Sequence, residues 1–122
     1  MVTADFSEHL FTYLSKTENL RSLRFDHTNI LSYGNAMKVL SGLLIQLKTL
    51  EELTFTKCSL DSEKCKILAD SLMRMKKLKI FRMTTQKGLG MGLASIIYNL
   101  SFNPNLIVLD LKDITIAPNE VN

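Results

Sequence analysis

The chain has 122 residues, a formal net charge of +3, 46% hydrophobic residues and 22% charged residues. This balance predicts one soluble folded domain over residues 1–122 and excludes a chain that is disordered throughout. No apolar stretch approaches the roughly 18 consecutive residues of a membrane span. The first residues include early acids and lack a basic segment before an apolar run, so we expect no secretion signal and a cytoplasmic protein.

In chain order, the first expected element is an amphipathic helix over residues 1–16, whose apolar face includes Phe6, Leu10, Phe11 and Leu14. A strand follows near residues 20–25. Three further strands are expected at 50–55, 78–83 and 106–111, each preceded by a helix.

Short polar residues and glycines mark the expected ends of these helices. Of the three helices that lie between strands, the first begins near Tyr33-Gly34-Asn35. Asp61 or Ser62 can cap the second, which runs through Leu72. The third begins near Gly90-Met91-Gly92, and Asn103-Pro104-Asn105 ends it before the last strand.

The four strands carry one repeated pattern, apolar-x-x-apolar-x-apolar. Its copies start at Leu20, Leu50, Leu78 and Leu106, so they lie 28 or 30 residues apart. The residues six before each start are Leu14, Leu44, Leu72 and Leu100, and those ten before are Leu10, Leu40, Leu68 and Ile96. Because positions four apart share one face of a helix, each repeat reads as strand, loop, helix, loop.

This pattern resembles the leucine-rich repeat family, specifically the ribonuclease-inhibitor-like subfamily with repeats of about 28 residues. The resemblance covers nearly the whole chain and implies an α/β leucine-rich repeat solenoid of about four repeats. Such a fold is a short right-handed arc, with a parallel sheet on the concave side and helices on the convex side.

In that family, position nine of the repeat bonds to loop backbone and position eleven is apolar. Position nine is Thr28, Cys58, Gln86 and Ile114 here, and position eleven is Ile30, Leu60, Gly88 and Ile116. Gln86, Gly88 and Ile114 depart from the pattern, so we expect irregular third and fourth loops. Only residues 112–122 follow the last strand, which predicts a fragment of a longer array or self-association through an exposed C-terminal edge.

Alternate strand residues should line the concave face, because they point away from the core. The candidate partner-binding residues are Arg24, Asp26, Glu52, Thr54, Ile80, Arg82, Asp110 and Lys112. Arg24, Thr54, Arg82 and Asp110 should form one row across the strands, beside an apolar pair of Ile80 and Val108. Arginine and apolar anchors among polar groups are typical of protein contact surfaces.

The leading hypothesis is therefore a protein-interaction module of the inhibitor, innate immune receptor or regulatory scaffold type. One alternative implied by the resemblance is a GTPase-activating or actin-regulatory domain. Another is a binder of nucleic acid or acidic lipid through the basic residues Arg74, Lys76, Lys77 and Lys79. Nucleic acid is the less favoured partner, because these cations are ordinary at the end of a helix and no aromatic residues alternate with them.

No pattern in the chain predicts an enzyme, a cofactor or a metal. Ser22, Asp26 and His27 do not form a catalytic triad, because neighbouring strand residues point to opposite faces. The glycines in Lys87-Gly88-Leu89-Gly90-Met91-Gly92 lack the spacing of a phosphate-binding loop and favour a flexible turn between a strand and a helix that approach each other closely. Cys58 and Cys65 lack further ligands for a metal site, and we expect free buried thiols in preference to a disulfide.

Overall fold

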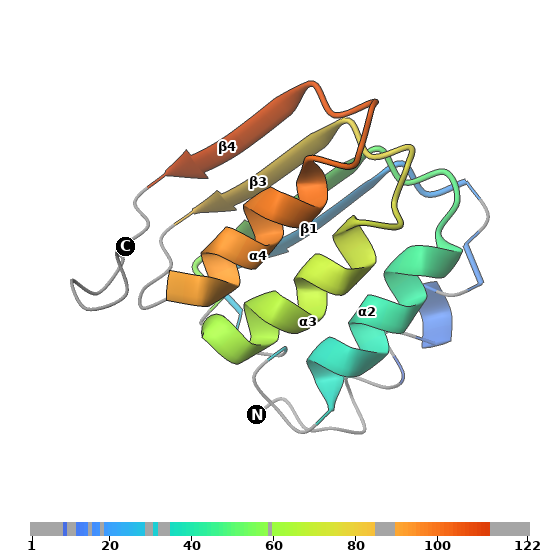
Figure 1. Ribbon diagram of the computed structural model, residues 1–122. Coiled ribbons are helices and arrows are strands. Elements are labelled where there is room, and N and C mark those ends of the chain that lie inside the picture. The colour runs from blue at the N-terminus through green and yellow to red at the C-terminus, as the bar shows by residue number, and fades with distance from the viewer. Residues whose placement is uncertain are drawn as a thin grey trace.

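The computed structural model shows a sheet of parallel strands with helices packed on one face (Figure 1). It describes residues 9, 12–14, 16–17, 19–28, 31, 35–58, 60–84 and 90–112. Its elements in chain order are β1 (Ser22–Asp26), α2 (Ala36–Gln46), β2 (Glu52–Thr56), α3 (Ser62–Leu72), β3 (Ile80–Thr84), α4 (Gly90–Leu100) and β4 (Val108–Lys112).

The sheet order is β1-β2-β3-β4, and each neighbouring pair is parallel. The register aligns Arg24 with Thr54, Thr54 with Arg82, and Arg82 with Asp110, as the repeat predicted. Figure 1 shows α2, α3 and α4 side by side in the same order as the strands. The expected α/β architecture, with parallel strands alternating with helices, is therefore confirmed, and the arrangement is compatible with a solenoid.

The local signals for helix starts hold where the structure describes them. Asp61 caps α3, because its Oδ1 accepts a hydrogen bond of 2.9 Å from the Lys64 amide. Asn35 precedes α2 without a side-chain capping bond, and α4 begins at Gly90. The carboxylate cap gives α3 the clearest sequence-encoded start of the three helices.

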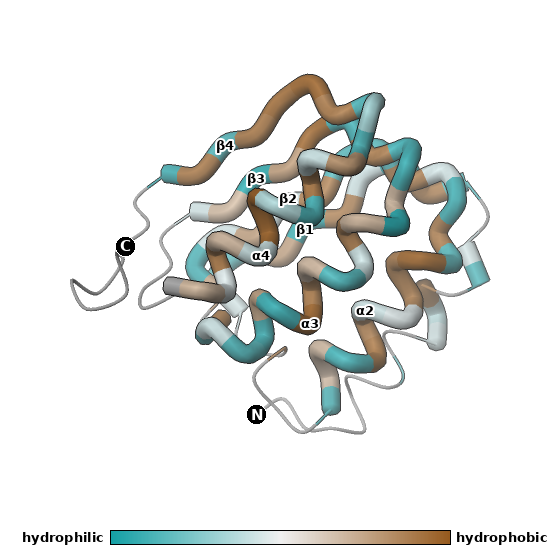
Figure 2. Tube along the Cα trace, viewed as in Figure 1, coloured by the Kyte–Doolittle hydropathy of each residue, from teal (hydrophilic) through white to brown (hydrophobic). Residues whose placement is uncertain are grey.

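The repeated leucines form the core between the helices and the sheet. Leu40, Leu68 and Ile96, at one position of successive helices, are each 0% exposed. From the strands, Phe25 stacks on Phe55 with ring centroids 5.4 Å apart. Figure 2 shows hydrophobic and hydrophilic residues alternating along α2 and α3, as expected for helices with one buried face.

Gly92 lets α4 approach the start of α3 closely. Its amide donates a hydrogen bond of 3.0 Å to Ser62 Oγ, and a Cβ placed on Gly92 would lie 2.6 Å from the Ser62 carbonyl oxygen. A side chain at this position would push the two helices apart. This contact joins two helices, whereas the sequence predicted a close approach of a strand and a helix, and residues 87–89 of that segment lie outside the described residues.

Several other expectations concern residues that the structure does not describe. They include most of the N-terminal helix at 1–16, the apolar loop positions Ile30 and Ile116, and the positions that depart from the repeat pattern, Gln86, Gly88 and Ile114. Leu14, from the expected helix, is described and is 8% exposed, as a core position requires. None of the described helices has the length and hydrophobicity to cross a membrane.

Candidate functional site

The face of the sheet away from the helices carries the predicted partner-binding residues, and we call it the sheet face. The strand residues that alternate with the sheet-face residues, such as Leu53 and Phe81, point into the core and are 0% exposed. Because successive strand residues point to opposite sides, their burial fixes which residues lie on the sheet face. The sheet face comprises Ser22, Arg24, Asp26, Glu52, Thr54, Thr56, Ile80, Arg82, Thr84, Val108, Asp110 and Lys112.

Arg82 lies at the centre of a charged network that crosses the sheet face. Its Nη1 lies 2.8 Å from Glu52 Oε1, and its Nε lies 3.7 Å from Asp110 Oδ2. Ser22 Oγ donates a hydrogen bond of 3.0 Å to Glu52 Oε2, and Lys112 Nζ lies 3.8 Å from Asp110 Oδ2. Side chains from all four described strands are thus linked in one series of contacts.

Arg24 and Asp26 form a separate ion pair on β1. The hydrogen bond from Arg24 holds the pKa of the Asp26 carboxyl below its usual value, so Asp26 is ionised at neutral pH. Thr54 lies between Arg24 and Arg82 in the register and is only 4% exposed, because longer side chains surround it. Of the predicted binding residues on the sheet face, Thr54 therefore offers little surface to a partner.

An apolar pair lies beside this network. Ile80 and Val108 are neighbours in the register of β3 and β4, and both are partly exposed. The sheet face therefore combines paired charges of both signs with an aliphatic patch. Ser22 contacts Glu52 and Asp26 contacts Arg24, so these two residues do not converge as a triad would require.

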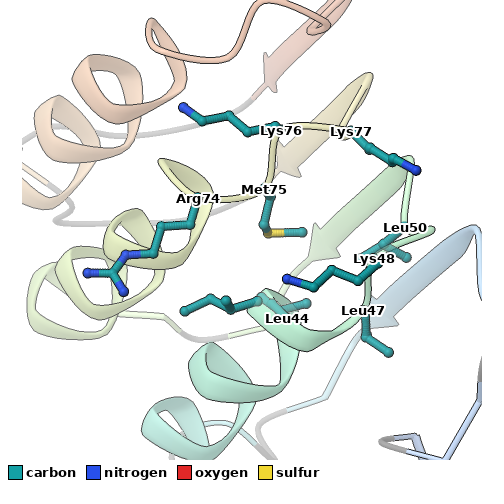
Figure 3. A pocket seen from close by; sticks show the side chains of 9 residues that line it. Leu44, Leu47, Lys48, Leu50, Arg74, Met75, Lys76 and Lys77 are labelled. Carbon is teal, nitrogen blue, oxygen red and sulfur yellow. The ribbon is translucent and has the colours of Figure 1, made fainter.

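The predicted basic residues divide into two places. Arg74, Lys76 and Lys77 line a cavity of about 330 Å³ together with Lys48 (Figure 3). Lys79 instead pairs with Glu51, with Nζ 3.5 Å from Oε2. The cavity, which we call the basic loop pocket, lies between the loop from α2 to β2 and the loop from α3 to β3. Each loop is counted with the strand that it enters, so these are the helix-to-strand loops of the second and third repeats. The other lining residues of the pocket are Leu44, Ile45, Leu47, Leu50 and Met75.

Lys48 is the pocket residue that the sequence interpretation missed. It lies two residues before the start of its strand motif, the same position that Lys76 has in the next repeat. Since adjacent repeats stack, equal positions meet in space, and the repeat register was the available signal. Lys48 therefore extends the predicted basic patch onto a neighbouring repeat.

The C-terminal end of the stack exposes apolar positions that are buried one repeat earlier. Leu109 is 41% exposed, whereas Phe81 at the same position of the third repeat is 0% exposed. Likewise, Ile97 on α4 is 44% exposed, whereas Ala69 on α3 is 1% exposed. An apolar end of this kind supports the expectation of a further repeat or a second copy here, which remains a prediction.

Both cysteines are free and buried. Cys58 Sγ donates to the Phe25 carbonyl oxygen at 3.0 Å, the kind of backbone bond that the resemblance implied for position nine. Burial raises the pKa of the Cys58 thiol, and it raises the pKa of Cys65 to about 12. Among the residues that the structure describes, no three His, Cys, Asp or Glu side chains are grouped to hold a metal ion.

In comparisons with known proteins, the chain matches no protein-family model and no curated sequence.

Proposed function

We propose that this chain is a protein-interaction module of the leucine-rich repeat type, which binds a partner protein through the sheet face. The observation that carries the proposal is the position of Arg82, held between Glu52 and Asp110 beside the aliphatic Ile80. Arginine and apolar side chains are frequent binding anchors. An arginine that is already held in place loses little conformational freedom on binding, which favours affinity.

The charges of the sheet face favour protein over nucleic acid as the partner. Its acids and bases alternate and pair with each other, as between Arg82 and Asp110, so the face has no uniform positive surface. Nucleic-acid binding depends on many cations that are free to contact phosphates. We also propose a cytoplasmic location, where free thiols such as Cys58 and Cys65 stay reduced.

Affinity capture from an extract of the source cells tests this proposal. The tagged wild-type chain is compared with Ile80→Asp and Arg82→Ala, after circular dichroism has shown that both variants fold. Lys38→Glu is the control, because Lys38 is exposed on α2, in the helix layer. The same partner should be lost from both sheet-face variants and kept by the control. A partner retained by Ile80→Asp and Arg82→Ala would show that the sheet face does not bind it.

A further inference from the structure

At two of the three interfaces between repeats, a polar side chain of one helix-to-strand loop donates a hydrogen bond to a main-chain carbonyl group of the preceding loop. Between the first and second repeats, Thr49 Oγ1 donates a hydrogen bond of 2.8 Å to the Leu20 carbonyl oxygen. Between the third and fourth, Asn103 Nδ2 donates to the Leu78 carbonyl oxygen at 3.0 Å and to that of Met75 at 2.8 Å. Leu20 and Leu78 both start their strand motifs, so their carbonyl groups are equivalent.

The middle interface has no such side-chain bond to a carbonyl group among the described residues and is joined instead by the ion pair of Lys79 and Glu51. Its equivalent acceptor is the carbonyl of Leu50, which receives no hydrogen bond from the part of the chain that the structure describes. Met75 stands where the next repeat has Asn103, and Lys77 stands where the preceding repeat has Thr49. The side chain of Met75 has no hydrogen-bond donor. The basic loop pocket opens at this interface, and Leu50 is among its lining residues.

The interior of the basic loop pocket is apolar and recessed. Leu44 is 1% exposed, Leu50 is 2% exposed and Met75 is 6% exposed. The volume of about 330 Å³ is at the lower end of the range of ligand pockets. Because these residues are almost covered, the apolar surface that the pocket offers to a side chain of a partner comes mainly from Ile45, which is partly exposed, and from the methylene stems of the basic side chains.

The charged residues that line the pocket are all cations, of which Arg74 pairs with Asp70 outside the lining, with Nη2 3.9 Å from Oδ1. Four cations and no carboxylate line it. Lys48 and Lys77 form no ion pair within the described residues, whereas Lys76 Nζ donates to the Phe102 carbonyl oxygen at 3.1 Å. In Figure 3, Arg74 and Lys77 end on opposite sides of Met75, so the charged groups do not converge on one point. Separate carboxylates fit this arrangement better than a single phosphate, which needs convergent donors.

We propose that the basic loop pocket binds an acidic peptide segment of a partner protein. One apolar side chain of the peptide enters the recess above Met75, and acidic residues on either side approach Lys48 and Lys77. A main-chain N–H of the peptide donates a hydrogen bond to the Leu50 carbonyl oxygen. The equivalent carbonyl oxygens at the flanking interfaces, of Leu20 and Leu78, accept hydrogen bonds from Thr49 and Asn103. This second binding surface is independent of the sheet face and does not rest on it.

Two other anionic partners fit the pocket less well. A membrane surface is bound by apolar side chains that protrude into it, whereas the apolar residues here are recessed. Single-stranded nucleic acid is bound by aromatic side chains that stack on bases, and the lining contains no aromatic residue.

Fluorescence anisotropy with a labelled synthetic peptide tests the proposal. The probe has one leucine flanked on both sides by glutamates, and a matched peptide carries serine in place of the leucine. We expect the leucine peptide to bind at least about tenfold more tightly than the serine peptide, and more weakly as salt rises. The combined Lys48→Glu, Lys77→Glu variant should lose at least about tenfold in affinity. Lys38→Glu and Ile80→Asp should bind as the wild type does.

A second variant closes the pocket without reversing charge. Combining Met75→Asn with Lys77→Asn reproduces the asparagines found at the equivalent positions Asn103 and Asn105, and it should abolish peptide binding in a chain that still folds. Equal binding of the leucine and serine peptides, or full binding by the folded Asn variant, would overturn the proposal. So would binding of phosphatidylserine vesicles or of a single-stranded oligonucleotide at concentrations where the leucine peptide does not bind.

Discussion

Glu52 on β2 and Arg82 on β3 are joined diagonally across the sheet, because Glu52 lies opposite Ile80 in the register while its Oε1 lies 2.8 Å from Arg82 Nη1. The two side chains are 32% and 37% exposed, so water screens their attraction only in part. A double-mutant cycle with Glu52→Gln and Arg82→Met should therefore give a coupling energy of about 0.5–1 kcal/mol.

Urea denaturation of the four proteins in the cycle measures this coupling, which should decrease as salt is added. The Glu63 and Lys66 pair on α3 is the control, because its side chains are 82% and 45% exposed and its coupling should be near zero. Equal coupling energies for the two pairs would mean that the sheet face does not hold Arg82 in place.

Asp61 should make the stability of the chain depend on pH. Replacing Asp61 with Ala removes the cap of α3 and should cost about 1 kcal/mol at neutral pH. The hydrogen bond from the Lys64 amide lowers the pKa of Asp61 in the folded protein. Its contribution is therefore complete above the pKa of the unfolded chain and is lost as the pH falls through the lower folded value.

Urea denaturation at a series of pH values tests this expectation. The difference in unfolding free energy between wild type and Asp61→Ala should shrink as the solution becomes acidic. Asp61→Asn also caps the helix but does not ionise, so its advantage over Asp61→Ala should stay constant. A wild-type advantage that does not change with pH would contradict the role of the ionised carboxylate.

The strands, the helices and their register could be predicted because burial acts on every repeat in the same way. A residue such as Leu40 must be apolar, and so must Leu68 and Ile96, since all three fill the same layer of the core. The cap at Asp61 could be predicted for a different reason, because it depends only on residues within one turn of it.

The remaining features depend on contacts between repeats, which a pattern within one repeat does not contain. Thr54 is buried because of the lengths of its neighbours on other strands. Lys48 joins Lys77 in the basic loop pocket because adjacent repeats stack. Lys79 does not line the basic loop pocket, and it pairs with Glu51, one repeat earlier. Predicting these contacts requires placing the repeats next to each other.

Asn103 should be the most costly polar residue to replace in the last repeat. It is 7% exposed, and its amide group donates to the carbonyl oxygens of Met75 and Leu78. Its Oδ1 accepts a hydrogen bond of 2.9 Å from the Asn105 amide. Asn103→Leu introduces an apolar side chain like Met75 at the equivalent position, but it leaves the Met75 and Leu78 carbonyl groups and the Asn105 amide without this partner. We therefore expect the free energy of unfolding to fall by about 2–3 kcal/mol.

Thermal and urea denaturation measure this loss. Met75→Leu, at the equivalent position of the third repeat, is the matched control and should cost less than about 1.5 kcal/mol, because it exchanges one apolar side chain for another. If Asn103→Leu is no more destabilising than Met75→Leu, the hydrogen bonds of Asn103 do not hold the last two repeats together.

The two thiols should be unreactive in the folded chain. Cys58 and Cys65 are both 0% exposed, and burial raises the pKa of Cys65 to about 12, so its thiolate is scarce at neutral pH. A disulfide-exchange reagent that reports reaction with thiolate should detect no rapid reaction in buffer and both cysteines in denaturant.

Because the pKa of Cys65 is raised in the folded chain, the stability of the fold should fall as the pH rises above 9.0, where the unfolded thiol ionises and the folded one does not. Cys65→Ala should reduce this alkaline decline without removing it, because the pKa of Cys58 is also raised, and a rapid reaction of either thiol in the native chain would contradict its burial.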